Sequence, residues 1–298
     1  MNLGGLTFRA AAVRTWTRIN HDAILTRAAA ISFYAFAALV PFMALLIALT
    51  AHLLPWLAPT VTGEPGSDLA EPFHDLLPAD AASFVARELG RLRAEPPSGL
   101  ISFGLTAVLW LSSSVFVEII DAMNFILGVK ETRSFWKRRL MAMVMTLSQA
   151  AILMVAVLSV VAWPQIVSFL GLSRSATILA TVIHQVIVFF SVLLSFALVL
   201  YVAPNSDQHW EWITPGSLLG TVVLMALSLF FRIYTQYLSN YSATYGSLAG
   251  IILLMTWLWF SSILLLAAAE FNKVIKNASP VDKPIELQRE RARMSAFD

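Results

Sequence analysis

Long apolar stretches, separated by short polar segments, dominate the pattern of this 298-residue chain. There are six of them, and each exceeds the roughly 20 residues that a helix needs to cross a hydrocarbon core of ~30 Å. They lie near Ala28–Leu54, Gly99–Ile120, Leu140–Val167, Ala176–Ala203, Pro215–Leu238 and Ser247–Asn272. Because backbone polar groups inside a bilayer must be satisfied within the protein, the pattern predicts an all-α, polytopic membrane protein with six transmembrane helices.

The composition agrees with a membrane protein and excludes several kinds of site. Hydrophobic residues make up 58% of the chain and charged residues only 13%, whereas about a quarter of the residues of a soluble domain are charged. The chain has no cysteine, which excludes disulfides, thiolate nucleophiles and cysteine-bound metals. The first apolar stretch starts late and is too long for a cleavable signal, so we expect it to remain as a transmembrane helix.

The distribution of Lys and Arg predicts the orientation in the membrane. Of the 20 basic residues, 15 fall on the side of the two termini and four on the opposite side, and Arg232 lies within the fifth stretch. Because cytoplasmic loops of membrane proteins are enriched in Lys and Arg, we expect both termini in the cytoplasm.

This reading divides the chain into three parts. Residues 1–27 form a basic cytoplasmic segment, either an amphipathic helix at the membrane surface with Trp16 as an interfacial anchor or simply a segment that fixes the orientation. Residues 28–272 form the transmembrane domain, with an external loop at 55–98 that contains a short surface helix. Residues 273–298 form a basic cytoplasmic tail.

Proline and glycine positions indicate the shape and packing of the helices. Pro41 lies in the middle of the first stretch and predicts a kink. Gly216 and Gly220, like Gly246 and Gly250, have the small-xxx-small spacing that allows close contact between membrane helices.

Ionisable residues at membrane depth are candidates for a substrate path, because charges inside a bilayer are costly. At 1.5 Å per residue, Arg232 lies about 9 Å and His184 about 12 Å from the outer end of their helices. They could share an outward-facing cavity near the loop residue Tyr245. Alternatively, Arg232 extends to the outer headgroups and His184 serves a helix contact. The candidate path residues are Arg232, His184, Tyr245, Gly246 and Pro41.

A second polar group is expected at the cytoplasmic ends of helices two and six. It consists of Glu118, Asp121, Asn124 and Glu270. It could form a gate or an ion site, or simply interfacial ion pairs. In a bundle of unbroken helices, Glu118 cannot reach Arg232. The serines of the run 112–114 are expected to hydrogen-bond to neighbouring backbone or helices.

Sequence signatures of catalysis are missing. There is no phosphate-binding loop, no zinc-protease motif and no serine-hydrolase motif. We therefore expect no enzymatic activity, no cofactor and no metal. The basic tail is too short and too mixed in sign to indicate nucleic-acid binding, so anionic lipid headgroups are its expected partners.

Several segments in order resemble the YihY/BrkB family of bacterial inner-membrane proteins. They are Arg27–Tyr34 leading to Leu39-Val40-Pro41, Ser114-Val115-Phe116 with Asp121–Asn124, Trp136–Arg139, Trp212 with Pro215-Gly216, Tyr245–Ala249, Trp257-Leu258-Trp259 and Ala268-Ala269-Glu270. The resemblance spans about residues 20 to 275. It implies six transmembrane helices and a location in the bacterial inner (plasma) membrane.

The chain departs from the family pattern in two places. The usual Gly-Ala-Glu is Ala268-Ala269-Glu270 here, and the basic stretch expected before helix five is replaced by Asn205–Gln208. Family members have carried a ribonuclease label, but this sequence offers no nuclease metal site and no groove for RNA.

Two functions follow from the sequence. The first is a transporter or permease-like protein for a small solute, which Arg232 suggests is anionic, or for a lipid. The second is a non-transporting envelope-integrity or assembly protein that acts through the external loop and the tails. The sequence leaves the substrate, the energy source and a homo-oligomeric state open.

Overall fold

The computed structural model describes residues 5–21, 23–53, 103–170, 174–206, 213–237 and 248–278. Within these ranges every regular element is an α-helix. The helices are α1 (Phe8–His21), α2 (Ile24–Leu53), α5 (Phe103–Ser112), α6 (Ser114–Leu127), α7 (Phe135–Leu170), α8 (Arg174–Val202), α9 (Pro215–Tyr237) and α11 (Leu248–Ala278). The external segment 55–98, with its expected surface helix, and the tail beyond residue 278 lie outside the described residues.

Six segments of the described chain are long and apolar enough to cross a membrane. Five are single helices, whereas the second combines α5 and α6 in the span Thr106–Leu127. The prediction of an all-α protein with six membrane spans is thus confirmed.

The second span corrects the assumption of unbroken helices. It is interrupted at Ser113, which separates α5 from α6. It also continues past Ile120 and ends at Leu127, where Gly128 has φ +70°. The N–H groups of Gly128 and Val129 donate to the carbonyls of Phe125 and Asn124. This left-handed cap favours glycine, which lacks a Cβ.

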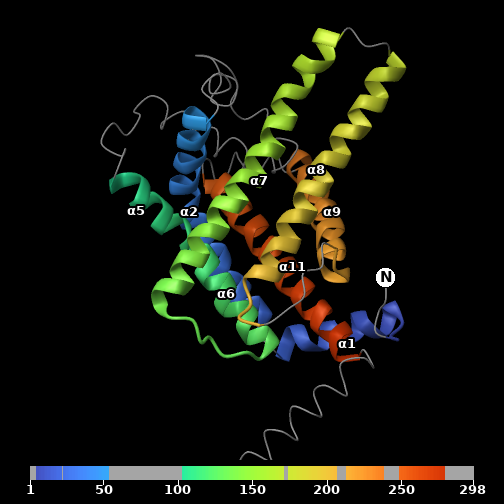
Figure 1. Ribbon diagram of the computed structural model, residues 1–298. Helices are drawn as coiled ribbons and strands as arrows, with labels where there is room; N and C mark the ends of the chain where they lie inside the picture. Colours follow the sequence, from blue (N-terminus) through green and yellow to red (C-terminus); the bar gives the residue numbers. More distant parts are fainter. Residues whose placement is uncertain are drawn as a thin grey trace, which may run out of the picture.

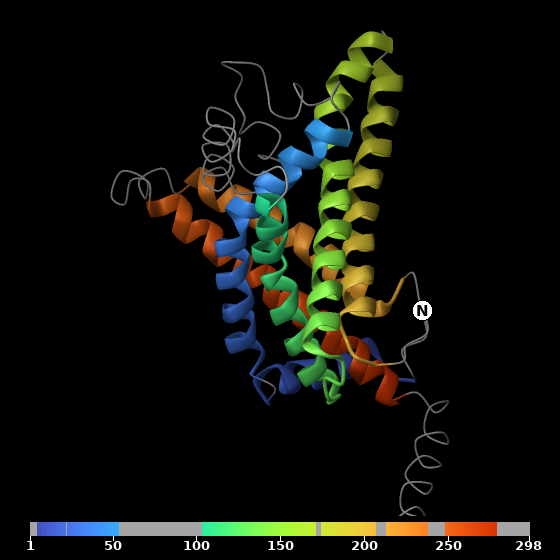
Figure 2. The same cartoon turned by 60° about the vertical axis from the view of Figure 1, so that its left-hand side comes forward.

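The helices α2, α6, α7, α8 and α11 surround the main hydrophobic core. Its fully buried members include Ile24, Ile120, Met123, Met145 and Leu266. The long helices α7 and α8 form an antiparallel pair that rises above the other described helices in both views (Figures 1 and 2). Polar contacts also join this pair, since Ser195 Oγ donates to Gln149 Oε1 at 2.6 Å.

The helix α1 lies across the lower end of the bundle, next to the C-terminal end of α11 (Figures 1 and 2). Ala11 packs against Phe271 and Ile275 of α11, while Trp16 is 68% exposed. Within the N-terminal segment, the structure thus places a helix over Phe8–His21. Because α1 and the end of α11 share one end of the bundle, we call this the inner end, following the orientation that Lys and Arg predict.

Close contact between α9 and α11 confirms the packing predicted for Gly216 and Gly220. A Cβ at Gly216 would overlap the backbone oxygen of Ala268. Asn272 adds polar contacts, because its Oδ1 accepts the Gly216 N–H at 2.7 Å and its Nδ2 donates to Thr214 Oγ1 at 3.0 Å. Glycine is required here by space, since only a residue without Cβ lets the two backbones approach this closely.

The helix α2 changes direction part of the way along its length (Figure 2). Pro41 lies inside this helix. A proline removes one backbone hydrogen bond and kinks a helix, so the bend agrees with the prediction made for Pro41.

Candidate functional site

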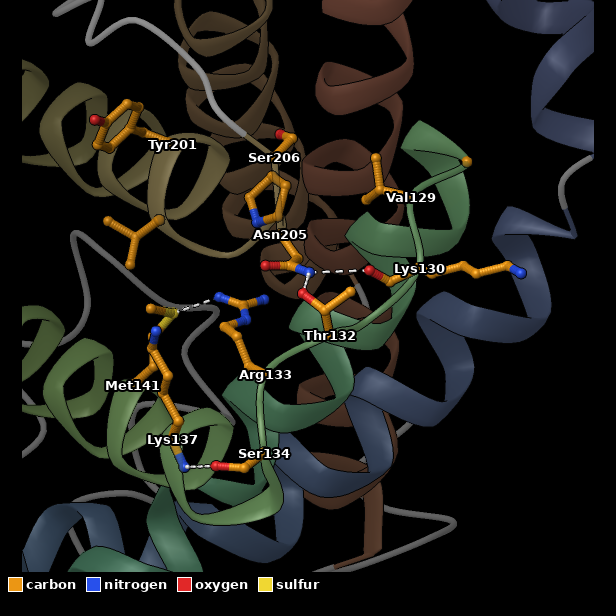
Figure 3. A pocket seen from close by; sticks show the side chains of 13 residues that line it. Val129, Lys130, Thr132, Arg133, Ser134, Lys137, Met141, Tyr201, Asn205 and Ser206 are labelled. Atoms are coloured by element: carbon orange, nitrogen blue, oxygen red, sulfur yellow. Dashed lines mark hydrogen bonds between the residues drawn. The ribbon is translucent and has the colours of Figure 1, made fainter. Parts of the chain in front are cut away.

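A pocket of about 1050 Å³ opens at the inner end, between the segment 128–134 and the end of α8 (Figure 3). Its walls come from the start of α7, from Tyr201 and Val202 of α8, and from residues 204–206. This volume is just above the usual range for small-molecule sites, which is about 300–1,000 Å³.

Two cations face this pocket, and a third basic residue does not. Figure 3 shows the Arg133 guanidinium in the middle of the view and the Lys137 side chain reaching the same region. The Lys130 side chain extends away from them, so this residue lines the pocket through its backbone. Because the Arg133 guanidinium is paired with the Glu131 carboxylate, Lys137 supplies the cationic side chain of the lining that favours an anionic ligand.

Hydrogen bonds hold the two walls of the pocket together. Asn205 Nδ2 donates to the Lys130 carbonyl at 2.9 Å and to Thr132 Oγ1 at 2.8 Å. The Asn205 N–H donates to Asn124 Oδ1 at 2.7 Å. Arg133 Nη2 donates to the Ala203 carbonyl at 3.0 Å. These contacts fix the segment after α6 against the segment after α8.

Glu131 completes this network. Its Oε1 accepts from Arg133 Nε at 2.8 Å, and its Oε2 accepts from Arg133 Nη2 at 2.8 Å and from Asn124 Nδ2 at 2.8 Å. We call Asn124, Glu131, Arg133 and Asn205 the polar clasp. Burial raises the pKa of Glu131, but the hydrogen bonds and charge of Arg133, with the bond from Asn124, outweigh it and hold the pKa below its ordinary value.

The lowered pKa of Glu131 leads to a prediction on stability. Its stabilising effect is complete above the ordinary carboxyl pKa and is lost as the pH falls through the lowered value. We expect Glu131→Gln to destabilise the protein by about 1–3 kcal/mol at pH 7, as for hydrogen bonds to charged groups. The difference in melting temperature between wild type and variant, measured in detergent, should shrink below about pH 5.

The matched control for this prediction is Asp121→Asn. Asp121 pairs with Arg138 at 2.7 Å, but its side chain is 41% exposed, so the loss should stay within about 1 kcal/mol. An Asp121 variant that melts lower than the Glu131 variant at pH 7 would contradict the importance of the polar clasp.

The break between α5 and α6 receives a side chain from α7. The Arg139 guanidinium donates through Nη2 to the Trp110 carbonyl and to Ser114 Oγ, the latter at 3.3 Å. It also lies 4.1 Å from the centre of the Trp110 ring. The Trp110 carbonyl, which residue 114 would bond in an unbroken helix, also accepts the Ser113 hydroxyl at 2.8 Å.

The first turns of α7 thus contribute side chains to two separate places, the pocket and the break between α5 and α6. Lys137 and Met141 line the pocket, and they are four residues apart, on one face of a helix. Arg139 is about 200° from Lys137 around the helix and faces the break between α5 and α6.

The structure distributes the predicted cytoplasmic polar cluster over three places. Glu118 lies within electrostatic range of Asp121, Arg138 and Arg27, and the Arg27 guanidinium carbon lies 3.7 Å from the centre of the Phe125 ring. This group of opposite charges joins α2, α6 and α7.

The other two members of the cluster lie elsewhere. Asn124 belongs to the polar clasp. Glu270 is fully buried, with Lys273 Nζ 3.8 Å from its Oε2. Lys273 also donates to the carbonyl of Ile126 near the end of α6. The arrangement includes the interfacial ion pairs expected for this region, and a gate or ion site stays a prediction.

The predicted substrate-path residues are placed as follows. His184 of α8 is 8% exposed, and its ring stacks on Trp163 of α7 with centroids 5.2 Å apart. Arg232 lies on the exposed surface of α9. Pro41 is half-buried in α2. Tyr245 and Gly246 lie outside the described residues, and a shared path for the five stays a prediction.

Sequence reasoning missed the two arginines that the structure makes central. Arg133 counted only as a loop charge that sets the orientation, and Arg139 also belonged to the Trp136–Arg139 segment of the family resemblance, with no role assigned to it. The signal for Arg139 was the triple serine at 112–114, which allows a break but does not identify its partner. For metals, the described ranges hold no group of three His, Asp or Glu side chains that could bind an ion.

These features define a class: a polytopic helical membrane protein with a broken span and a cationic inner pocket. Residues 15–293 match the family described as virulence factor BrkB, and the chain belongs to that family. It is a multi-pass protein of the bacterial inner membrane.

Several relatives cover most of the chain. A ribonuclease-like protein of Bacillus subtilis, YfkH, is 29% identical over 84% of this chain and 89% of its own length. A UPF0761 membrane protein of Alkalilimnicola ehrlichii is 26% identical over 88% of this chain, which spans only 57% of that relative. One from Pseudoalteromonas atlantica is 23% identical over 87% of this chain and 84% of its own length. No solved structure matches the chain.

Proposed function

We propose that this protein is a transporter or permease-like protein that moves a small anionic solute, or a lipid with an anionic headgroup, across the inner membrane. The observation that carries the proposal is the pocket at the inner end, into which Arg133 and Lys137 extend (Figure 3). Its polar lining and the Lys137 ammonium suit an anion that enters from the cytoplasm, while Arg133 is held in place by its pair with Glu131.

Features within the membrane support this function. Interrupted helices and kinked helices are common where membrane proteins bind a substrate, because backbone groups freed from the helix can contact it. Here the second span is interrupted at Ser113, between α5 and α6, and α2 bends. Arg232 and His184 remain candidates for the outer part of the path.

The experiment is a flux measurement in proteoliposomes with a panel of small anions, and with a fluorescent anionic lipid in a second arm. Lys137→Glu should raise the KM for the transported anion by about fivefold, the equivalent of about 1 kcal/mol for an exposed charge. Lys130→Glu changes the net charge equally, but its side chain points away from the pocket (Figure 3), so its KM should match that of wild type.

The outcomes separate the two candidate functions. If neither an anion nor a lipid crosses the membrane faster than in empty liposomes, the transport proposal fails. An envelope defect upon deletion of Thr60–Arg93, with flux intact, would favour the alternative role in envelope integrity for that loop.

A further inference from the structure

Arg139 is a cation enclosed within the membrane-spanning region, and the described residues give it no acidic partner. Its side chain is 8% exposed, and its contacts are the Trp110 carbonyl, the Trp110 ring and Ser114 Oγ. None of the ion pairs in the described ranges includes Arg139. Arg138, a second cation, acts on Arg139 electrostatically. Among the described residues no carboxylate balances the charge of Arg139, which is met only by the partial negative charge at the C-terminal end of α5, through the Trp110 carbonyl.

The depth of this charge makes the missing counter-charge costly. Trp110 and Ser114 lie in the span Thr106–Leu127, and at 1.5 Å per residue Ser114 is roughly 20 Å from the inner end of α6. Segment 128–134 runs back along α6, so α7 begins beside this helix rather than below it (Figure 1). Buried charges are normally paired, because desolvation of a lone ion costs several kcal/mol.

Two polar atoms near the break between α5 and α6 lack a hydrogen-bond partner among the described residues. Both hydrogen bonds of the guanidinium leave from Nη2, and Nε is buried without an acceptor in the described part of the protein. Ser112 Oγ, one residue before the break, is likewise buried and has no hydrogen-bond partner among the described residues. Ser114 begins α6, a helix of 14 residues whose N-terminal end carries partial positive charge.

We propose that the break between α5 and α6 is a binding site for a small anion, held by the Arg139 guanidinium and the N-terminal end of α6. The anion supplies the negative charge that the described side chains do not. Helix N-termini bind anions through free N–H groups and the helix dipole, and an adjacent arginine adds charge-assisted hydrogen bonds. The site is separate from the inner pocket, because Arg139 faces away from Lys137 on α7.

The alternative is that Arg139 only joins α7 to the broken span. A purely structural role explains the bonds to Trp110 and Ser114, but it leaves the charge and the Nε donor without a partner. The two roles differ in one measurable respect, which is whether the stability of the protein depends on the anion in solution.

The test measures thermal unfolding of the full chain in detergent at constant ionic strength. Sodium gluconate, whose anion is large, is the baseline against chloride, nitrate, phosphate and acetate. A further arm adds short-chain phosphatidylglycerol to the gluconate buffer. We expect at least one small anion to raise the melting temperature in a saturable way, and Arg139→Gln to shift the half-saturating concentration at least about tenfold.

Two further variants keep the proposal falsifiable if Arg139→Gln does not fold. Ser112→Ala removes a hydroxyl without a partner in the described structure, so it should fold normally but weaken the anion effect. Arg138→Gln removes the neighbouring charge, which pairs with Asp121, and should leave the effect in place. Equal melting temperatures in all salts would overturn the proposal. Stabilisation by the lipid alone would also overturn it, as would an anion effect that persists in both the Ser112 and Arg139 variants.

Binding at Arg139 and transport are separate measurements. An anion that stabilises wild type but not the Arg139 variant supports the site even when liposomes show no flux. In that case the transport proposal fails and the anion is a resident part of the structure.

Discussion

Substitution of Gly216 by alanine is expected to lower the stability of the protein by about 2–3 kcal/mol, the upper part of the roughly 1–3 kcal/mol that overpacking typically costs. The added Cβ would overlap the Ala268 backbone oxygen and lie 2.7 Å from the Asn272 Cγ. Backbone atoms cannot move aside without shifting α9 from α11, and that shift would also break the Gly216–Asn272 hydrogen bond.

Gly220→Ala is the matched control in the same helix. Its Cβ would lie 2.6 Å from Phe196 Cε1, an atom of a side-chain ring that can adjust more easily than a backbone. Thermal unfolding and size-exclusion chromatography in detergent should therefore rank the stabilities as wild type, then Gly220→Ala, then Gly216→Ala. A Gly216 variant as stable as wild type would show that α9 and α11 are not in this close contact.

Asn124→Asp is the second substitution with a large expected effect. Asn124 is 4% exposed, and its Nδ2 donates to Glu131 at 2.8 Å. Aspartate has the same shape but places a second carboxylate oxygen against that of Glu131. We expect a loss of about 3 kcal/mol at pH 7, since the donor is lost and two like charges meet in a partly buried site.

The effect of Asn124→Asp should decrease on acidification, because two adjacent carboxylates can share a proton. The measurement is the melting temperature of wild type and variant between pH 7 and pH 4. Asn124→Ala, which removes both hydrogen bonds without adding charge, is the control and should show a smaller recovery, limited to the bond that helps to lower the pKa of Glu131. A loss of stability that is the same at both pH values would contradict the contact with Glu131.

The sequence predicted the fold well because apolar length is a local property. Each span needs only enough consecutive apolar residues. The spacing of Gly216 and Gly220 likewise predicted close helix packing without any knowledge of the fold. The break at Ser113 was missed because serine is tolerated in a membrane helix and the break depends on Arg139, which lies 26 positions further along the chain.

The candidate sites were harder to predict, because they depend on contacts between segments that are distant in the sequence. Asn124 was identified as polar at a helix end, but its partners Glu131 and Asn205 come from segments whose positions only the folded bundle defines. His184 was identified as an ionisable side chain at membrane depth, yet its stacking on Trp163 depends on how α7 and α8 align. Spacing along one helix gives depth, whereas contact between helices requires their rotation and register.

The unequal lengths of the helices affect the surrounding lipid. At 1.5 Å per residue, the 36 residues of α7 extend about 54 Å and the 23 residues of α9 about 35 Å. A hydrocarbon core of ~30 Å matches α9 with little adjustment, but even a tilt of about 40° leaves α7 longer than the core. The longest helix, α7, therefore exceeds the core by more than α9 does. The stability of the protein should consequently depend on the acyl-chain length of the bilayer. This dependence should arise mainly from the lipids next to the α7–α8 pair.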